Sequence, residues 1–590
     1  MATRSTLNPT TAAAPRWPLV PALALLLAGA VRADVSAPGA EVPWITVEAE
    51  AMHTNGTVLG PSYAPYLVET ESSGQRCVRL DAAGQFVEFV APAEANAIVV
   101  RYSLPDSARG GGVTSSLRLM VNGRPVRTLA LTSRYTHLYG AYPFSNDPRQ
   151  GKARNFYDEL RVKGLAIARG DVVRLEHASG DAVPCWLDLV DLEEVPPPLA
   201  APANAVSVRD CGARGDGVAD DTAAVRAGLA AAQKQGRTLW VEPGDYKVTG
   251  DLEVPSGVTI QGAGMWHTTF VGDEAVYGDA ARRVRLRLVG RGMRLADFAI
   301  VGRLNYRNDS EPNDGVVGAG CADASMARIW IEHTKVGAWI YNGTHLRIEA
   351  CRFRDLLADG VNLCVGSSGC VIENCSARGT GDDCFAIWPV PSDQGFLQGE
   401  HPGHNVIRHC TGQLPFLANG GSLYGGAGNR IEDCLFTDIT AGCGILVSTT
   451  FPTSDEARGI DNNFSETTEV RRCTLLRCGG YDHDWAWRGA FQICLDRRSI
   501  SGLAISDLVI RDSFSDGLMV VAPGSARGQG TLSHCRLENI AIGQVGLEGP
   551  GHHELFVRAD ARGGLTLAGP PVADVRNDSA EFRIGGGDVK

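Results

Sequence analysis

Three aspartates near the middle of the chain have a spacing that suits acid–base chemistry. Asp359 begins the sequence Asp-Gly-Val-Asn, while Asp382 and Asp383 end the sequence Gly-Thr-Gly-Asp-Asp at 379–383. Carboxyl groups that lie close together raise one another's pKa, so that one holds its proton while another is ionised. Hydrolysis of a glycosidic bond by two carboxyl groups needs this division of roles.

A sequence repeat indicates how these aspartates come together. An aliphatic residue, two or three polar residues and a cysteine recur, at Cys351, Cys375, Cys410, Cys434, Cys473 and Cys535. The interval from 351 to 375 and from 410 to 434 is 24 residues, the same as from Asp359 to Asp383. This period is typical of a parallel β-solenoid, whose neighbouring coils lie about 4.8 Å apart. We therefore expect Asp359 and Asp383 on adjacent coils, and the cysteines as a buried ladder of mostly free thiols.

Three interpretations of the aspartates compete at this point. They are the acid and base of a glycosidase, the calcium ligands of a polysaccharide lyase, or surface acids on a solenoid turn. The match between their spacing and the coil period favours the first two over the third. A lyase also needs a separate base and an acidic sugar.

The start of the solenoid is marked by residues 210–222, which are rich in Asp, Gly and Thr and precede a helical stretch at 223–235. We expect the helix to cover the open end of the solenoid and the Asp and Thr residues to cap its N-terminus. The pair Asp220 and Asp221 is then structural. This opening resembles that of the pectate-lyase-like right-handed β-helix superfamily.

Composition and punctuation divide the rest of the chain. Residues 1–33 carry three arginines, no acid and a short apolar run, the layout of a secretory signal peptide. Residues 42–195 contain short alternating strands between turn residues and predict a β-sandwich of jelly-roll type. The proline-rich stretch 196–204 is a linker, and 205–590 form the solenoid. The predicted fold class is thus all-β, a sandwich followed by a right-handed parallel β-helix.

The sandwich resembles carbohydrate-binding modules of families 6 and 35 at residues 47–50, 121–124 and 186–191. That resemblance implies a structural calcium ion held by Glu48, Glu50 and Asp188, since carboxylates are hard oxygen ligands. Cys77 and Cys185 could form a disulfide bridge in this domain. The aromatic and amide residues of 135–159 suit either sugar binding or packing against the second domain, and the sequence does not separate the two.

Most of the stretch 42–590 resembles glycoside hydrolase family 87, because Asp-Gly-x-Asn precedes Gly-x-Gly-Asp-Asp by one coil on a β-helix behind a β-sandwich. The family comprises inverting endo-enzymes, α-1,3-glucanases and mycodextranases, that act on neutral α-glucans. The resemblance implies that Asp382 is the general acid and that Asp359 and Asp383 hold the attacking water. Exchanging Asp382 and Asp383 leaves the sequence argument unchanged. Family 28 polygalacturonases carry a similar trio, but their Gly-His-Gly and Arg-Ile-Lys signatures are not found downstream.

Polar and aromatic residues around the trio are candidates for substrate binding. A flat ring suits the face of a pyranose, and Asn362 can bond a hydroxyl or orient Asp359. The full set is Asn362, Trp388, Tyr424, Asp482, Trp485 and Trp487.

Charge sets the expected partners. The formal net charge of −12 argues against nucleic acid and, more weakly, against a polyanionic polysaccharide. No apolar run after the leader is long enough to span a bilayer. We expect a secreted monomer that acts on an α-glucan and needs no cofactor for catalysis.

Overall fold

The structure is a computed structural model and describes residues 38–140, 144–178, 182–391, 402–482, 486–523 and 530–586. The predicted signal peptide lies outside these residues. The described chain is mostly β-strand, and its one α-helix is α1 (Thr222–Gln235). None of the described helices has the length and apolar composition that a membrane crossing needs.

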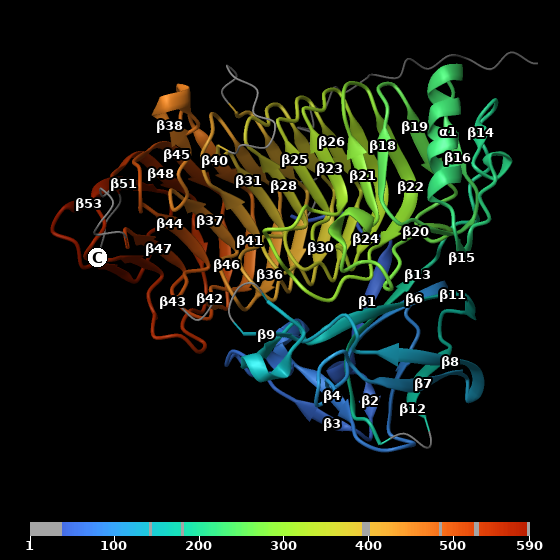
Figure 1. The fold of residues 1–590 in the computed structure, drawn as a ribbon. Helices are drawn as coiled ribbons and strands as arrows, with labels where there is room; N and C mark the ends of the chain where they lie inside the picture. The colour runs from blue at the N-terminus through green and yellow to red at the C-terminus, as the bar shows by residue number, and fades with distance from the viewer. Residues whose placement is uncertain are drawn as a thin grey trace, which may run out of the picture. The chain divides into compact units, whose positions relative to one another are not determined.

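Residues 44–193 form two antiparallel sheets that enclose one apolar core (Figure 1). The first sheet contains, in spatial order, β11 (Tyr157–Ile167), β6 (Ala95–Ser103), β13 (Cys185–Glu193), β4 (Cys77–Leu80) and β3 (Thr57–Leu59), with β1 (Trp44–Glu48) also paired to β13. The second contains β2 (His53–Thr54), β5 (Phe86–Val90), β12 (Val172–His177), β7 (Thr114–Val121) and β8 (Arg124–Thr132). In β7 the buried Leu117 and Leu119 flank the exposed Arg118, the alternation of a sheet with one apolar face.

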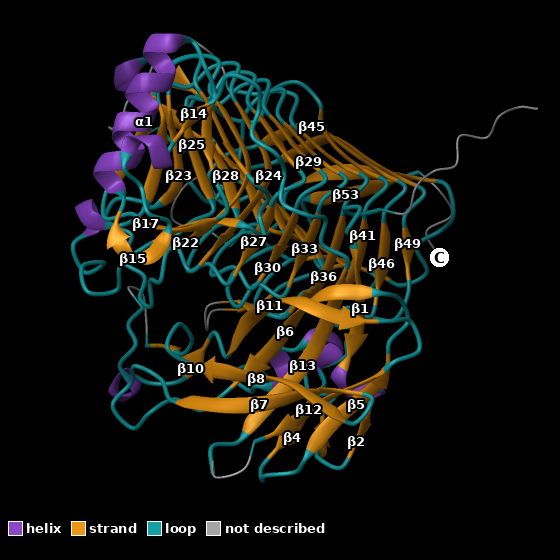
Figure 2. Cartoon of the chain, turned by 90° about the vertical axis from the view of Figure 1, so that its right-hand side faces the viewer, coloured by secondary structure: helices purple, strands orange, loops and turns teal. Residues whose placement is uncertain are grey.

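The remainder of the chain is a parallel β-helix, so the all-β class predicted from the sequence is confirmed (Figures 1 and 2). One long sheet stacks β18 (Asp251–Val254), β21 (Arg285–Leu288), β23 (Gly315–Ala319), β25 (Ala338–Tyr341), β28 (Val361–Cys364), β31 (Phe385–Trp388), β34 (Gly421–Leu423), β37 (Ile445–Ser448), β44 (Phe491–Cys494), β47 (Leu518–Val521), β50 (Leu555–Val557) and β52 (Val575–Asn577). A second runs from β14 (Val206–Ser207) to β53 (Phe582–Gly585), and each central coil gives it two short strands, such as β26 (Arg347–Glu349) with β27 (Arg352–Arg354) and β29 (Val371–Glu373) with β30 (Ser376–Arg378).

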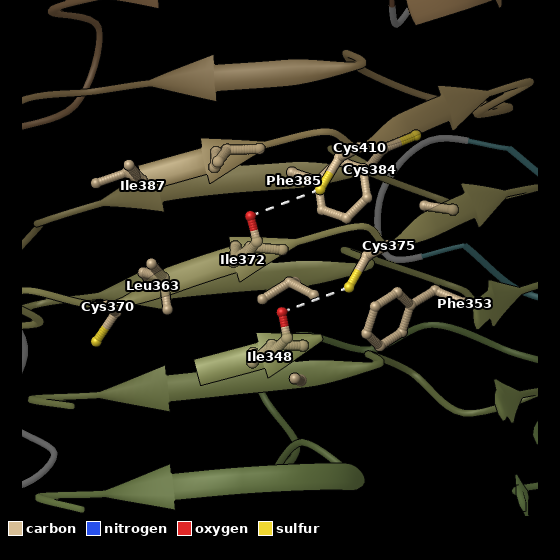
Figure 3. Packing of buried hydrophobic residues seen from close by; sticks show 14 of the residues in the cluster. Ile348, Phe353, Leu363, Cys370, Ile372, Cys375, Cys384, Phe385, Ile387 and Cys410 are labelled. Carbon is tan, nitrogen blue, oxygen red and sulfur yellow. Dashed lines mark hydrogen bonds between the residues drawn. The ribbon is translucent and has the colours of Figure 1, made fainter. Parts of the chain in front are cut away.

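Identical positions of successive coils stack inside the helix. The parallel register aligns Ile348, Ile372, Ile407 and Ile431, all of which are buried. A ladder cysteine follows each of these isoleucines three residues later, so the cysteines form a column of their own. The thiols of Cys375 and Cys410 point to the carbonyls of Ile348 and Ile372 one coil back (Figure 3). None of the sixteen cysteines, all of which lie in the described part of the chain, is in a disulfide, so the ladder contains no disulfide and Cys77 is not bridged to Cys185.

The residue before each ladder cysteine explains the polar part of the repeat. It turns the chain with a positive φ, as in Asn374 (53°), His409 (49°) and Asp433 (56°). Asn and Asp tolerate this left-handed conformation better than most residues do. A polar turn followed by a small buried residue therefore recurs once per coil.

Helix α1 covers the first coil, as the sequence predicts. Its buried Val225, Leu229 and Ala232 belong to the core of the β-helix. Asp220 accepts a hydrogen bond from the Thr222 backbone N–H at the start of the helix, and Asp221 accepts from the backbone N–H groups of Arg214 and Gly215. Both carboxylates are thus engaged in local structure.

The sheet β11–β6–β13 packs against the β-helix. Apolar contacts join Val99 and Val195 to Trp266 and Trp330. Buried ion pairs also cross this boundary, which we call the domain interface: Arg352 with Glu193, Arg378 with Asp191 and Glu159, and His333 with Asp158. The stretch 135–159 takes part in this packing, because Tyr135 stacks on His333.

Candidate active site

The backbone of two adjacent coils places Asp359 beside Asp383. Each aspartate lies two residues before a strand of the same sheet, and Val361 of β28 pairs with Phe385 of β31. The Gly360 N–H donates to the Asp383 carbonyl at 3.0 Å. The 24-residue spacing therefore corresponds to one coil.

A close approach between the same two coils also brings in Asp382. A Cβ on Gly381 would stand 2.2 Å from the Leu357 carbonyl oxygen, which leaves room only for glycine. Asp359, Asp382 and Asp383, the aspartate trio, each offer a carboxylate oxygen within 4.8 Å of the others. Asp359 and Asp383 are buried, whereas the Asp382 side chain is 26% exposed.

Neighbouring donors fix the two buried carboxylates. Asn362 donates its amide to Asp359 Oδ1 at 3.1 Å, which is the orienting contact that the sequence suggested. Asp383 Oδ1 accepts from the Asn419 amide at 2.8 Å and the Asn419 backbone N–H at 3.1 Å. The Tyr424 hydroxyl donates to Asp383 Oδ2 at 3.0 Å.

The electrostatics of the trio favour bound protons. Burial, followed by the charges of Asp382 and Asp383, raises the pKa of Asp359 well above its usual range. Burial and the Asp382 charge raise the pKa of Asp383 to about 7. Because interacting carboxyl groups titrate together, the trio as a unit retains a proton near neutral pH.

One arginine compensates the trio. Arg307, from the segment between β22 (Arg294–Val301) and β23, places Nη2 2.5 Å from Asp382 Oδ2. It also pairs with Asp309 at 3.0 Å, and its side chain is only 8% exposed. The repeat does not predict Arg307, because Arg307 lies in an insertion that interrupts the repeat. Its 75-residue separation from Asp382 leaves no local signal.

Aromatic residues lie on the same sheet next to the trio. The partly exposed Trp388 ring lies 5.8 Å from Trp339 and 5.6 Å from the exposed Phe451. Trp339 and Phe451 were not predicted, although Trp339 precedes Asp359 by less than one coil. Tyr424 is buried and gives its hydroxyl to Asp383, so it does not offer the sugar-stacking face expected of it.

Two other predicted substrate-binding residues, Asp482 and Trp487, belong to later coils of the β-helix. Asp482 is buried and paired with Arg488 at 2.6 Å. The charges of Asp482 and Arg488 act on the thiol of Cys443, and so does the charge of Asp383. The pairing explains how Asp482 is buried, but its carboxylate is thereby occupied. Trp487 is partly exposed and contacts Tyr481. Trp485 lies outside the described residues.

The three predicted calcium ligands lie in one region of the sandwich, with different partners. Asp188 accepts from the Ser73 N–H at 2.9 Å and from Arg101, which accounts for both of its oxygens. Within the described chain, Glu48 Oε2, Glu50 Oε2 and Gln75 Oε1 are buried oxygens without a hydrogen-bond partner. Burial and the Asp188 charge raise the pKa of Glu48 to about 8.

Comparisons with known proteins agree with this architecture. Residues 41–195 match the family "Alpha-1,3-glucanase catalytic domain D1", and residues 221–580 match "Alpha-1,3-glucanase catalytic domain D2". The catalytic unit of a thermostable GH87 α-1,3-glucanase from Streptomyces thermodiastaticus is 30% identical with a TM-score of 0.77, covering 93% of this chain and 96% of that one. The catalytic domain of a GH87 α-1,3-glucanase in complex with nigerose is 23% identical with a TM-score of 0.76, covering 93% and 98%.

A more distant curated relative shares only part of the chain. A glucan 1,3-beta-glucosidase of Cochliobolus carbonum is 30% identical over 146 residues, which are 25% of this chain and 18% of that enzyme. The chain thus spans less than a fifth of that relative's length.

Proposed function

Because the chain belongs to the family of α-1,3-glucanase catalytic domains, we propose that it is a glycoside hydrolase that cleaves α-1,3-glucosidic bonds of a neutral glucan. Its substrate is α-1,3-glucan or a mixed α-1,3/α-1,4-glucan, and it cleaves internal bonds of the glucan. The observation that carries this proposal is the aspartate trio, whose three carboxylates lie within 4.8 Å of one another.

Exposure supports Asp382 as the general acid. It is the one member of the trio with a substantially exposed side chain, so it can reach the oxygen of a bound glycosidic bond. It protonates that oxygen as the bond to the anomeric carbon breaks, and the leaving sugar departs with a free hydroxyl. Trp388 and Phe451 offer the nearby aromatic surface for the sugar rings.

The buried pair Asp359 and Asp383 suits the attacking water. A water molecule with two hydrogen bonds of about 2.8 Å can bridge oxygens up to roughly 5.6 Å apart, and these oxygens lie within 4.8 Å. The trio retains a proton as a unit. When that proton resides on Asp382, an ionised carboxylate of the pair removes a proton from this water as its oxygen bonds the anomeric carbon. Asn362, Asn419 and Tyr424 hold the two carboxylates in place.

We propose inversion of configuration at the anomeric carbon because of the family resemblance, and not because of the distances between the carboxyl groups. The closest oxygens are nearer than the roughly 6.5–9.5 Å between the carboxyl groups of many inverting enzymes. Proton NMR during the first minutes of hydrolysis decides this point. A β-configured reducing end as the first product supports inversion, and an α-configured one contradicts it.

The proposed substrate is tested by incubating the protein with α-1,3-glucan, nigeran, dextran and polygalacturonate. We expect oligosaccharides from the first two substrates only, and no release from any of them by the Asp382→Asn variant. Unsaturated, ultraviolet-absorbing products from polygalacturonate that disappear with a chelator would instead indicate a calcium-dependent lyase. Saturated galacturonides would indicate a polygalacturonase.

We also propose a structural calcium ion in the sandwich. The unpartnered buried oxygens of Glu48, Glu50 and Gln75 fit a hard cation, and such an ion would offset their burial. Asp188 contributes charge nearby rather than a free oxygen. We expect a chelator to lower the melting temperature and calcium to restore it. An unchanged melting temperature, with no calcium found by elemental analysis, contradicts this site.

A further inference from the structure

Arg307 reaches the aspartate trio from a segment that does not belong to the repeat. This segment, residues 302–314, connects β22 to β23. Arg307 Nη1 donates to the Gly381 carbonyl at 2.6 Å and to the Leu357 carbonyl at 3.4 Å. Gly381 directly precedes Asp382, and Leu357 lies two residues before Asp359. One guanidinium therefore binds both turns that carry the trio, and the Asp382 carboxylate as well.

The β-sandwich holds this segment from the other side. The Arg307 N–H donates to the Phe144 carbonyl at 3.1 Å. Phe144 and Leu138 of the sandwich join Leu304 in an apolar cluster. The cluster also contains Leu357, Phe416 and Leu417 of the β-helix. Arg307 therefore contacts both the sandwich, through Phe144, and the trio, through Asp382.

Several charges act on Asp382. Asp359 interacts with it from the preceding coil and Asp383 from the next position in the same turn, and the charges of Asp382 and Asp383 act on the buried Tyr424. Arg307 is the cation bonded to it, and it shares that cation with Asp309. Lys335 lies farther out, bonded to the carbonyls of Asn308 and Glu311. Among these groups Arg307 alone is a permanent positive charge in contact with Asp382.

We propose that Arg307 is a positioning residue that acts through Asp382, by fixing its carboxylate and stabilising its ionised form, and that the sandwich holds Arg307 in place. The inference rests on the proposed hydrolase function and extends it. It gives the sandwich a part in arranging the active site, beyond any binding of carbohydrate. When Asp382 donates its proton, the charge that forms meets a guanidinium already in position.

The test compares Arg307→Met and Arg307→Lys with the wild-type chain on a soluble α-1,3-linked oligosaccharide. We expect Arg307→Met to lower kcat by about 100-fold, on the scale of losing one preorganised charge partner. Arg307→Lys should recover part of that loss because it keeps the charge. Removing a cation in contact with a carboxylate raises its pKa by about 1–3 units. Because the trio titrates as a unit and the Arg307 charge lowers the pKa of Asp359, one limb of the pH–rate profile should move to higher pH.

The limb that moves also identifies the role of the carboxyl group that Arg307 influences. A shift of the alkaline limb means that the group acts in its protonated form, as an acid, and a shift of the acidic limb means that it acts as a base. Either shift supports the positioning role. A profile with both limbs unmoved overturns it, even if kcat falls.

Arg283→Met is the matched control. Arg283 is equally buried and bonds Tyr306 and Glu311 of the same segment, and it has no described contact with the trio. We expect it to reduce stability without moving either limb. Circular dichroism confirms that each variant is folded. Identical profiles for Arg283→Met and Arg307→Met would contradict a specific role for Arg307. Failure of the wild-type chain to release sugars would refute the hydrolase proposal instead.

Discussion

Two buried regions of this molecule concentrate carboxylates, and they neutralise them differently. At the domain interface, Glu193 faces Arg352 in a two-pronged pair with both distances 2.7 Å, and Asp191 faces Arg378 at 2.7 Å. In the aspartate trio, Asp382 pairs with Arg307, which also pairs with Asp309, whereas Asp359 and Asp383 accept hydrogen bonds from neutral side chains. Matched charges suit a contact that must stay closed, because each ion keeps a partner after losing water.

The excess of carboxylates in the trio has a chemical consequence. Burial, followed by the charges of the neighbouring carboxylates, raises the pKa values of Asp359 and Asp383, so bound protons remove part of the charge of the trio. A site that holds both a proton and an ionised carboxylate can act as acid and base. The interface carboxylates Glu193 and Asp191 differ from the buried Asp359 and Asp383 in that each is paired with an arginine. Glu48 of the sandwich and Asp355 beside His333 share a raised pKa with the trio, so a raised pKa identifies catalytic carboxylates only together with the exposure of Asp382.

The largest expected effect comes from neutralising the trio. Asp359→Asn, Asp382→Asn and Asp383→Asn should each lower kcat by about 10³-fold or more, because each removes an acid, a base or a water ligand. Folding should persist, since an amide keeps the shape and relieves repulsion between the remaining carboxylates. Steady-state hydrolysis and urea unfolding measure the two properties. Two variants with full activity would refute the catalytic assignment.

The interface should respond in the opposite way. Arg352→Met leaves the buried Glu193 without its partner, and we expect a loss of about 3–5 kcal/mol in the free energy of unfolding. Combining it with Glu193→Gln should recover much of that loss, because no unpaired charge remains. The kcat of either variant, measured well below its melting temperature, should stay near that of the wild type. A large fall in kcat with unchanged stability would remove the distinction between the regions.

The sequence predicts a contact in these regions when both residues belong to the repeat, because their spacing then gives their relative positions. The coil period places Asp359 over Asp383 because parallel strands in register carry sequence spacing directly into space. The same rule predicts the cysteine ladder. Arg307 breaks the rule, since it comes from an insertion whose path is set by packing against the sandwich.

The interface was not predictable for a related reason. Asp158, Glu159 and Asp191 stand in sandwich strands, and their partners lie between about 175 and 220 residues later. Nothing in either stretch identifies the other, so the sequence left 135–159 open between sugar binding and packing. Asp188 illustrates the same limit, because its pairing with Arg101 depends on the register of β13 against β6.

The pH dependence of stability should separate the regions further. The pKa of Asp383 rises from its ordinary value near 3.8 to about 7 in the folded chain. The folded state therefore binds more protons than the unfolded state between these values, and this group's contribution is lost as the pH rises toward 7. Unfolding by urea at pH 5 and pH 8 should show the loss in the wild type and a smaller loss in Asp383→Asn. The double variant Arg352→Met/Glu193→Gln, which leaves no unpaired buried charge, should retain the wild-type dependence. An equal pH dependence in the wild type and Asp383→Asn would contradict the raised pKa.

Tyr424→Phe is the smallest of these changes, because it removes only the hydroxyl that donates a hydrogen bond to Asp383. Loss of its hydrogen bond to Asp383 should reduce kcat by about threefold to tenfold. The lost donor lowered the pKa of Asp383, so the limb that belongs to Asp383 should move to higher pH. Tyr341→Phe is the control, since Tyr341 contacts Trp339 on the same sheet and has no described contact with the trio. If both variants keep the wild-type profile, the neutralisation of Asp383 does not depend on its hydroxyl donor, and burial and the neighbouring charges alone hold its proton.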